Sequence, residues 1–129
     1  MSESEEADSS HRLRLAVVGP CSAGKSVLAN ALRGPEVEVR HVAQEHTIIP
    51  DLWRRLYPPD LLIYLDVSHQ VALARRPHTT GEPERLERQR ERLAHARQHA
   101  DFYLDTSSLT PEQVIEQVEA FLQAYQQTP

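Results

Sequence analysis

The sequence has little of several residue types, and each shortage excludes a class of protein. Its single cysteine, Cys21, leaves no internal disulfide possible, so a disulfide-stapled secreted domain is excluded and a reducing cytoplasm is the expected compartment. No apolar run approaches the roughly 20 residues of a bilayer-spanning helix, so we expect no membrane partner. The formal net charge of -5 argues against nonspecific nucleic-acid binding.

The rest of the composition is that of an ordinary globular protein. Hydrophobic residues make up 40% and charged residues 26% of the 129 residues, which predicts one domain with a modest core. Residues 1–10 are acidic and polar, the opposite of a secretory or mitochondrial leader, and are expected to form a disordered tail. We therefore predict a single domain over residues 11–127.

The chain has only four glycines, and two of them stand in one motif. Residues 19–26 read G-P-C-S-A-G-K-S, which matches the Walker A pattern G-x-x-x-x-G-K-[ST] of phosphate-binding loops. The motif follows an apolar run at residues 13–18 and precedes a helix-compatible stretch at residues 27–33. This strand–loop–helix context is the one in which such a loop can work, and it makes a chance glycine-rich turn the poorer interpretation.

The motif predicts how a nucleoside triphosphate is bound. The two glycines let backbone N–H groups turn inward around phosphates, Lys25 reaches the β- and γ-phosphates, and the Ser26 hydroxyl ligates Mg²⁺. The positive end of the following helix adds to the same anion site. Cys21 is at a variable position, where its thiol could be mildly reactive or simply small enough to fit. The predicted binding residues are Gly19, Pro20, Cys21, Ser22, Ala23, Gly24, Lys25, Ser26 and Val27.

Periodicity and turn residues predict alternating strands and helices. Gly34 is expected to take a left-handed cap after the first helix, Ser68 to cap a helix, and Thr110 with Gln113 to begin the last helix. This order predicts an α/β three-layer sandwich with a parallel sheet of about four to five strands and a ligand at their C-terminal edge. Strands are expected at 12–18, 36–43 (with a risk of an edge position), 61–66 and 102–104, and helices at 27–33, 51–57, 68–76, 83–100 and from 110.

Three segments together resemble one family. The glycine-rich motif, the segment P-D-L-L-I-Y-L-D-V-S at residues 59–68 and the segment A-D-F-Y-L-D-T-S at residues 100–107 resemble small-molecule P-loop kinases, with thymidylate, cytidylate and shikimate kinases nearest in pattern. The resemblance implies a P-loop NTPase fold, ATP with Mg²⁺, a lid-like segment at about 75–92, and a last strand whose loop approaches the nucleotide base.

The resemblance also suggests catalytic residues beside Lys25. Arg76, and less so Arg75, would neutralise the transferred phosphate, although arginine at a helix C-terminus is favoured by the dipole in any case. The acidic group is either Asp66, after the most apolar strand, or Glu45, at the end of the preceding strand; we prefer Glu45, whose plainer interpretation is a solvated loop carboxylate.

Other charged and aromatic residues have plainer explanations. The run at residues 84–92 is expected to be a solvated helix with internal ion pairs, although Arg88 or Arg92 could face the site. Seven histidines raise a metal hypothesis, from His95 with His99 or from His41 and His46 around Glu45, but exposed helix histidines explain them better. Trp53 is expected to pack in the core rather than to stack on a base.

The sequence departs from the kinase pattern at one place. The family inserts an acceptor-binding segment between the first helix and the acid-bearing strand, and here only residues 34–36 fill that space. An unknown small-molecule acceptor would then bind through residues 44–53 or through a partner chain. The sequence leaves two functions open: a small ATP-dependent phosphotransferase, or a nucleotide-dependent switch or adaptor with slow hydrolysis that acts on a protein partner. No D-x-x-G or N-K-x-D motif supports a GTPase.

Overall fold

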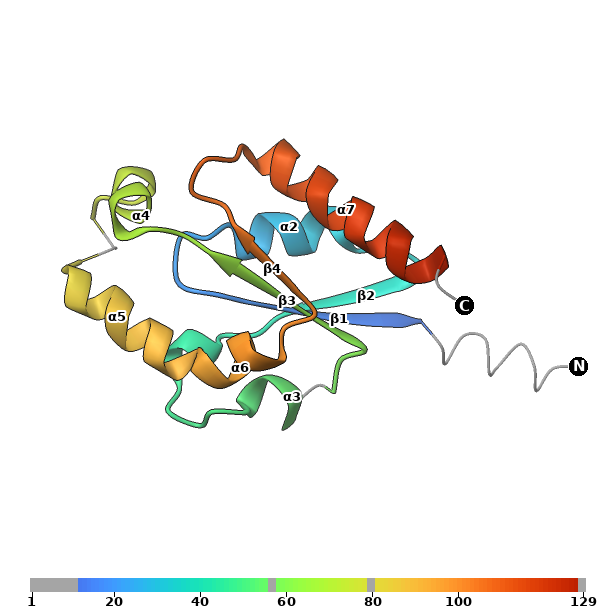
Figure 1. Cartoon of the computed structure of the whole chain (residues 1–129), viewed down its shortest axis with the longest axis horizontal. Coiled ribbons are helices and arrows are strands. Elements are labelled where there is room, and N and C mark those ends of the chain that lie inside the picture. The colour runs from blue at the N-terminus through green and yellow to red at the C-terminus, as the bar shows by residue number, and fades with distance from the viewer. Residues whose placement is uncertain (1–11, 56–57, 79–80, 128–129) are drawn as a thin grey trace, which may run out of the picture.

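The computed structural model describes residues 12–55, 58–78 and 81–127, so the expected tail and part of the predicted helix at 51–57 lie outside the described residues. Its elements alternate between strands and helices along the chain (Figure 1). In chain order they are β1 (Leu13–Val18), α2 (Lys25–Leu32), β2 (Val37–His41), the 3-10 helix η1 (Gln44–His46), α3 (Leu52–Arg55), β3 (Leu61–Asp66), α4 (His69–Arg75), α5 (Pro83–Arg92), α6 (Ala94–His99), β4 (Phe102–Asp105) and α7 (Pro111–Gln127).

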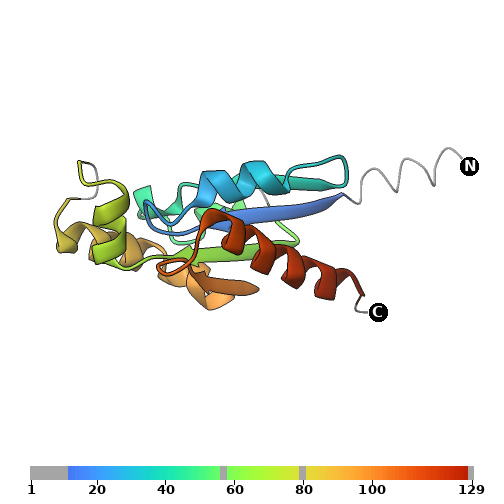
Figure 2. The same ribbon diagram turned by 90° about the horizontal axis from the view of Figure 1, so that it is seen from above.

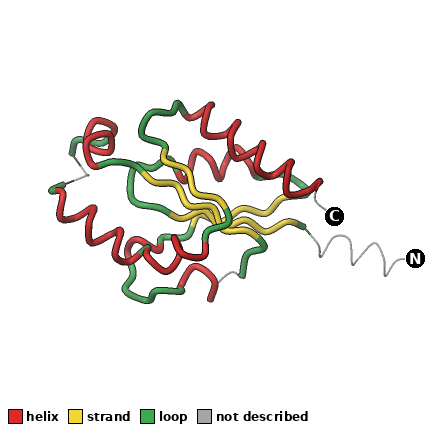
Figure 3. Tube along the Cα trace, in the orientation of Figure 1, coloured by secondary structure: helices red, strands yellow, loops and turns green. Residues whose placement is uncertain are grey.

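The four strands form one parallel sheet in the order β2-β1-β3-β4. This confirms the expected α/β class and parallel sheet, and the edge position considered for β2. Helices α2 and α7 lie on one face of the sheet, and α3, α5 and α6 lie on the other (Figures 1 and 2). Figure 3 shows the strands enclosed between these two groups of helices.

The central strands are apolar on both sides because both of their faces are covered. In β1, Leu15 and Val17 pack into the cluster shared with α2 and α7. Ala16 and Val18 point the other way, into the cluster that contains Trp53. Strand β3 is buried along its whole length. Trp53 is only 6% exposed, so the prediction that it packs in the core is confirmed.

Two of the predicted helix caps are confirmed. The Ser68 hydroxyl accepts the Val71 N–H at 3.2 Å and begins α4. At α7, the Thr110 hydroxyl accepts the Gln113 N–H at 3.1 Å while the Gln113 side chain accepts the Thr110 N–H at 2.9 Å. This reciprocal pair is the capping box that the sequence predicted.

The prediction of a left-handed Gly34 is wrong. The cap of α2 is Arg33 in an extended conformation, and Gly34 is not among the positive-φ glycines of the described residues. Instead Gly34 and Val37 exchange backbone hydrogen bonds at 3.2 and 3.4 Å. The connection to β2 is so short that it must reverse at once, and Pro35 suits the second position of such a turn.

The predicted single helix over 83–100 is divided at Leu93 into α5 and α6. The Gln44 amide donates to the Arg92 carbonyl at 3.3 Å, a group that would otherwise serve the helix ladder. A side chain inserted into the ladder is a common cause of a bend. Leu93 itself is fully buried beside Trp53 in the second core cluster.

The topology gathers four loops at the C-terminal edge of the sheet. The strand order reverses beside β1, and the connections after β1 and β2 lead to helices on opposite faces, an arrangement that opens a crevice between them. Among the described residues, no helix is both long and apolar enough to span a membrane.

Candidate functional site

The glycine-rich loop (residues 19–26) joins β1 to α2 and has an unusual backbone. Gly19 has φ of 152° and Gly24 has φ of 97°, conformations that favour glycine, and Ser22 is the positive-φ non-glycine residue of the described chain at 71°. A Cβ at Gly19 would overlap the Leu65 carbonyl oxygen on the neighbouring strand β3. The first glycine of the motif is therefore required by close backbone approach.

Helix α2 begins at Lys25 without a side-chain cap, because the residue before it is Gly24. Its first backbone bond runs from the Leu28 N–H to the Gly24 carbonyl at 3.1 Å. The three preceding amides, at residues 25–27, have no partner within the helix. A helix end of this kind attracts anions through both its free N–H groups and its dipole.

Lys25 lies inside the glycine-rich loop and is 5% exposed. Its ammonium group donates to the carbonyls of Gly19 and Pro20 and forms an ion pair of 2.5 Å with Oε2 of Glu45. Glu45 is 3% exposed, so it is not the solvated carboxylate of the plainer interpretation. The second carboxylate oxygen, Oε1, is buried without a hydrogen-bond partner.

Glu45 reaches Lys25 because η1 is anchored on both sides. The fully buried Gln44 accepts the Trp53 N–H at 2.8 Å and donates to the Ile49 carbonyl at 2.6 Å. From α5, Arg92 donates to the Glu45 carbonyl at 3.3 Å. These bonds fold residues 44–53 back over the sheet edge and hold the carboxylate against the glycine-rich loop.

A polar cavity of about 230 Å³ opens beside this ion pair. Burial and the Lys25 ammonium, in that order, lower the pKa of His41 on its rim, which favours the neutral ring. Most of the predicted binding and catalytic residues meet here. The lining residues are Cys21, Ser22, Gly24, Lys25, Ser26, Val27, His41, Glu45, His46 and Arg76.

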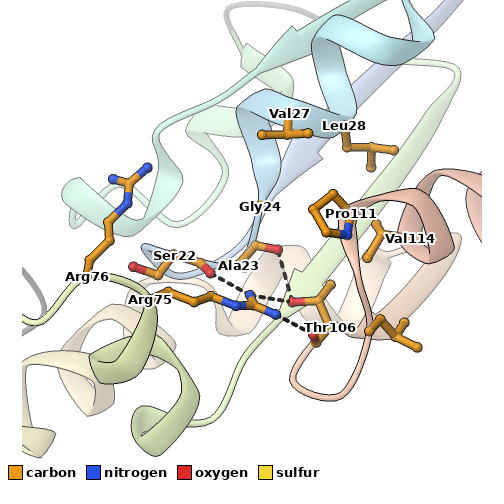
Figure 4. Close-up of a pocket in the computed structure, with 11 residues that line it drawn as sticks. Ser22, Ala23, Gly24, Val27, Leu28, Arg75, Arg76, Thr106, Pro111 and Val114 are labelled. Carbon is orange, nitrogen blue, oxygen red and sulfur yellow. Dashed lines mark hydrogen bonds between the residues drawn. The ribbon is translucent and has the colours of Figure 1, made fainter.

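A second cavity of about 240 Å³, more apolar, lies on the other side of the loop (Figure 4). Val27, Leu28, Pro111 and Val114 surround it with aliphatic carbon, and Ala23 and Gly24 form its edge toward the loop. The loop after β4 contributes Thr106 and Leu109. The two cavities therefore flank the start of α2.

The two adjacent arginines have different surroundings. Arg75 donates to the Ser22 carbonyl at 2.8 Å and to the Thr106 carbonyl at 2.6 Å, so it ties the glycine-rich loop to the loop after β4. Arg76 extends away from this group in Figure 4 and lines both cavities. Arg76 thus lies beside the glycine-rich loop, and the Arg75 guanidinium is bonded to protein carbonyls.

Asp66 lies in a different cluster from Lys25. Its carboxylate accepts the Tyr103 hydroxyl at 2.6 Å, the Val67 N–H at 2.8 Å and an Arg90 N–H at 3.3 Å. Tyr103 is 40% exposed, and its partial burial, followed by the bond to Asp66, raises its pKa to about 12. Arg90 thus bonds to the sheet edge rather than staying in a solvated helix pair. Of the two predicted acids, the structure brings Glu45, not Asp66, to Lys25.

The sequence analysis missed three polar residues that shape the site. Gln89 on α5 is 4% exposed and accepts the Cys21 N–H at 3.0 Å. Thr106 is 1% exposed, and its hydroxyl lies at hydrogen-bond distance, 3.0 Å, from both the Ala23 and the Asp66 carbonyl oxygens. Gln44 is the third. The signal that could have found these residues is a polar side chain at a buried position of a helix or at a strand end. Sequence alone does not show which positions are buried.

The histidine hypotheses separate in the structure. His95 accepts the Trp53 indole N–H at 3.2 Å, and its ring stacks on that of His99 with 4.2 Å between the ring centroids. These two histidines therefore contact each other and Trp53 on the surface of α6. Within the described parts of the chain, three side chains of metal-ligating type gather at one point: Cys21, Glu45 and His46, whose ligand atoms all lie within 4.8 Å of one another.

No family model matches the sequence, and no curated protein matches it.

Proposed function

We propose that this chain binds ATP with Mg²⁺ in the glycine-rich loop and acts as a small kinase-like phosphotransferase. The observation that supports it most is the buried Lys25–Glu45 pair between the strained loop and the open start of α2. Lysine and a helix N-terminus both attract phosphate, while the carboxylate supplies the acidic group that the transfer needs.

The residues present fit a magnesium ion. The buried Glu45 Oε1 has no hydrogen-bond partner, and Ser26 lines the same polar cavity as Glu45. Mg²⁺ prefers oxygen ligands and keeps several waters, so a serine hydroxyl and one carboxylate near its water shell are suitable donors. When bound, the ion would neutralise charge on the β- and γ-phosphates.

Binding of the ATP phosphates would break the ion pair between Lys25 and Glu45. Lys25 would turn its donors from Glu45 to phosphate oxygens, and the released carboxylate would be free to accept the proton of an attacking hydroxyl. The hydroxyl oxygen then bonds to the γ-phosphorus as the bond to ADP breaks. Arg76 would neutralise the transferred group from the rim, since guanidinium binds phosphate oxygens as a fork.

The apolar cavity suits the nucleotide base. Its aliphatic walls, Val27, Leu28 and Val114, offer apolar packing surface, and it adjoins the loop edge at Gly24. A base seated there would place the phosphates toward α2 and the acceptor in the polar cavity near His41 and His46. ATP is proposed over GTP because no guanine-reading motif occurs.

A label-transfer assay tests the binding half of this proposal. ATP carrying an acyl group on its γ-phosphate passes that group to an amine held near the phosphates, forming an amide and releasing ATP. Lys25 is the chain's only lysine, so an acylated lysine found by mass spectrometry identifies the site. We expect labelling that excess ATP prevents; labelling of the N-terminal amine alone would contradict it.

Turnover tests the transfer half. γ-labelled ATP is incubated with the protein and fractions of a small-molecule extract, and we expect label in one acceptor. Glu45→Gln should lower this rate by about 100-fold or more while ATP still binds. If wild-type protein releases only free phosphate in every fraction, phosphotransferase activity is refuted.

The second candidate, a nucleotide-dependent switch or adaptor with slow hydrolysis, is favoured by one observation. Only four residues separate α2 (ending at Leu32) from β2 (beginning at Val37), which leaves no acceptor-binding segment there. Slow release of free phosphate, unchanged by every fraction, would support this candidate instead.

A further inference from the structure

Cys21, Glu45 and His46 form a compact group of three different metal-ligating side chains at the mouth of the polar cavity. The Cys21 Sγ lies 3.7 Å from His46 Nε2 and 3.9 Å from Glu45 Oε2, and these last two atoms are 3.6 Å apart. No single hydrogen bond to the Cys21 sulfur and no single ion pair explains why all three atoms lie so close to one another.

The triangle has the size of one face of a zinc tetrahedron. Zn²⁺ bonds sulfur at about 2.3 Å, imidazole nitrogen at about 2.0–2.1 Å and carboxylate oxygen at about 2.0–2.2 Å. With tetrahedral angles these lengths give separations of about 3.6 Å for sulfur–nitrogen, about 3.6 Å for sulfur–oxygen and about 3.4 Å for nitrogen–oxygen. Each observed side is longer by no more than about 0.3 Å.

We infer that Cys21, Glu45 and His46 form a binding site for a single Zn²⁺ ion, with the fourth position open to water. A thiolate with an imidazole selects zinc over magnesium, whose preferred ligands are oxygens. Binding breaks the Cys21 S–H bond and releases that proton to solvent as the sulfur–zinc bond forms.

Two further observations support the site. Glu45 Oε2, the oxygen in the triangle, also bonds to Lys25, whereas Oε1 is buried without a hydrogen-bond partner, so the carboxylate has one oxygen to spare when Oε2 binds a metal. The Gln89 amide donates to the Cys21 sulfur at 3.4 Å, and its oxygen holds the Cys21 N–H. Such outer contacts fix ligands and favour the thiolate.

The ion can also enter and be tolerated. The His46 side chain is 51% exposed, so the triangle is open to solvent on one side. Lys25 can keep its bonds to the Gly19 and Pro20 carbonyls when Glu45 Oε2 binds the metal. The site needs no residue outside the glycine-rich loop and η1.

The inference has a regulatory consequence, which alone rests on the proposed function. Glu45 cannot serve a zinc ion and the transfer reaction at the same time. Zinc is therefore expected to lower the rate of phosphate transfer, because the ligated carboxylate no longer accepts the proton of the attacking hydroxyl.

The test is a zinc titration of the full, untagged chain in a non-thiol reductant, without nucleotide, in competition with a chromophoric chelator. Wild type is compared with Cys21→Ser and His46→Gln, and His99→Gln is the matched control on an exposed helix position. We expect one zinc per chain, affinity lowered at least about tenfold in the two site variants, and no change in the control.

Cobalt provides a second readout that depends on sulfur. With Co²⁺ in place of Zn²⁺, wild type should show a cysteinate-to-cobalt charge-transfer band that Cys21→Ser lacks, while circular dichroism shows both to be folded. Equal zinc affinity in wild type and Cys21→Ser, or zinc binding lost in His99→Gln, overturns the site. Since no nucleotide is present, failure to bind ATP leaves this result unaffected.

Discussion

Lys25 is the central residue of the candidate site, and its surroundings predict its contribution to stability. Its buried ammonium group faces the buried Glu45 carboxylate at 2.5 Å. Lys25→Met leaves that carboxylate without its partner, and we expect unfolding free energy to fall by about 3–5 kcal/mol in urea denaturation. The double variant with Glu45→Gln should recover most of the loss, because no buried charge remains. Strictly additive losses would refute a direct pair.

Gly19 predicts an effect of backbone rather than charge. Its φ of 152° is strained for other residues, and a Cβ there would overlap the Leu65 carbonyl. Gly19→Ala should lower the unfolding free energy by about 2–4 kcal/mol, measured by urea denaturation. Gly34→Ala is the matched control, since a Cβ added at Gly34 would meet no atom within 4 Å; it should change stability by at most about 1 kcal/mol.

Among the secondary-structure elements, Arg75 connects α4 to two loops. Its guanidinium bonds to the carbonyls of Ser22 and Thr106 and to the Thr106 hydroxyl. Arg75→Ala should cost about 1–2 kcal/mol in unfolding free energy, because these bonds are partly exposed to water. Arg76→Ala should mainly weaken ATP binding. The reverse ranking of the two variants in a thermal melt and an ATP titration would contradict these assignments.

Strands β3 and β4 are joined by the Tyr103–Asp66 side-chain hydrogen bond, which predicts a pH dependence of stability. The pKa of Tyr103 is raised from 10.0 to about 12 by burial and by that bond, so the folded state holds its proton longer than the unfolded state. This contribution is complete below pH 10 and is lost as the pH rises toward 12.

Urea midpoints measured across this alkaline range should fall, and Tyr103→Phe should flatten part of the decline. Burial also raises the pKa of Tyr64, so a slope remains in that variant. Tyr125→Phe on the exposed face of α7 is the control and should behave like wild type. An unchanged slope in Tyr103→Phe would show that the Asp66 bond does not carry the effect.

For the whole molecule, the sequence was a good guide where a local pattern determines structure. Apolar runs predicted β1 and β3, and the Thr110–Gln113 signature predicted the start of α7, because alternation and capping depend on neighbouring residues. The prediction of a left-handed Gly34 was wrong because the four-residue connection to β2 requires a reverse turn instead. The prediction of one helix through Leu93 was wrong, and the hydrogen bond from Gln44 to the neighbouring Arg92 carbonyl joins residues 48 positions apart.

The candidate site was predictable only in part for the same reason. The spacing of Gly19, Gly24 and Lys25 is local and could be read directly. Strands β2 and β3 both flank β1, so the choice between Glu45 and Asp66 depends on the position of η1, which contacts with distant residues of α3 and α5 determine. The contact of Gln89 with Cys21 joins residues 68 positions apart, and no local pattern encodes it.

Calorimetric titration of ATP, with and without Mg²⁺, tests the central claim most directly. The account predicts saturable binding of one ATP per wild-type chain, tighter with Mg²⁺ and tighter than GTP, and binding at least about 100-fold weaker in a folded Lys25→Ala variant. Zinc is removed beforehand so that the Cys21 group does not interfere. Absence of binding by ATP and GTP alike, or equal affinity in Lys25→Ala and wild type, would contradict it.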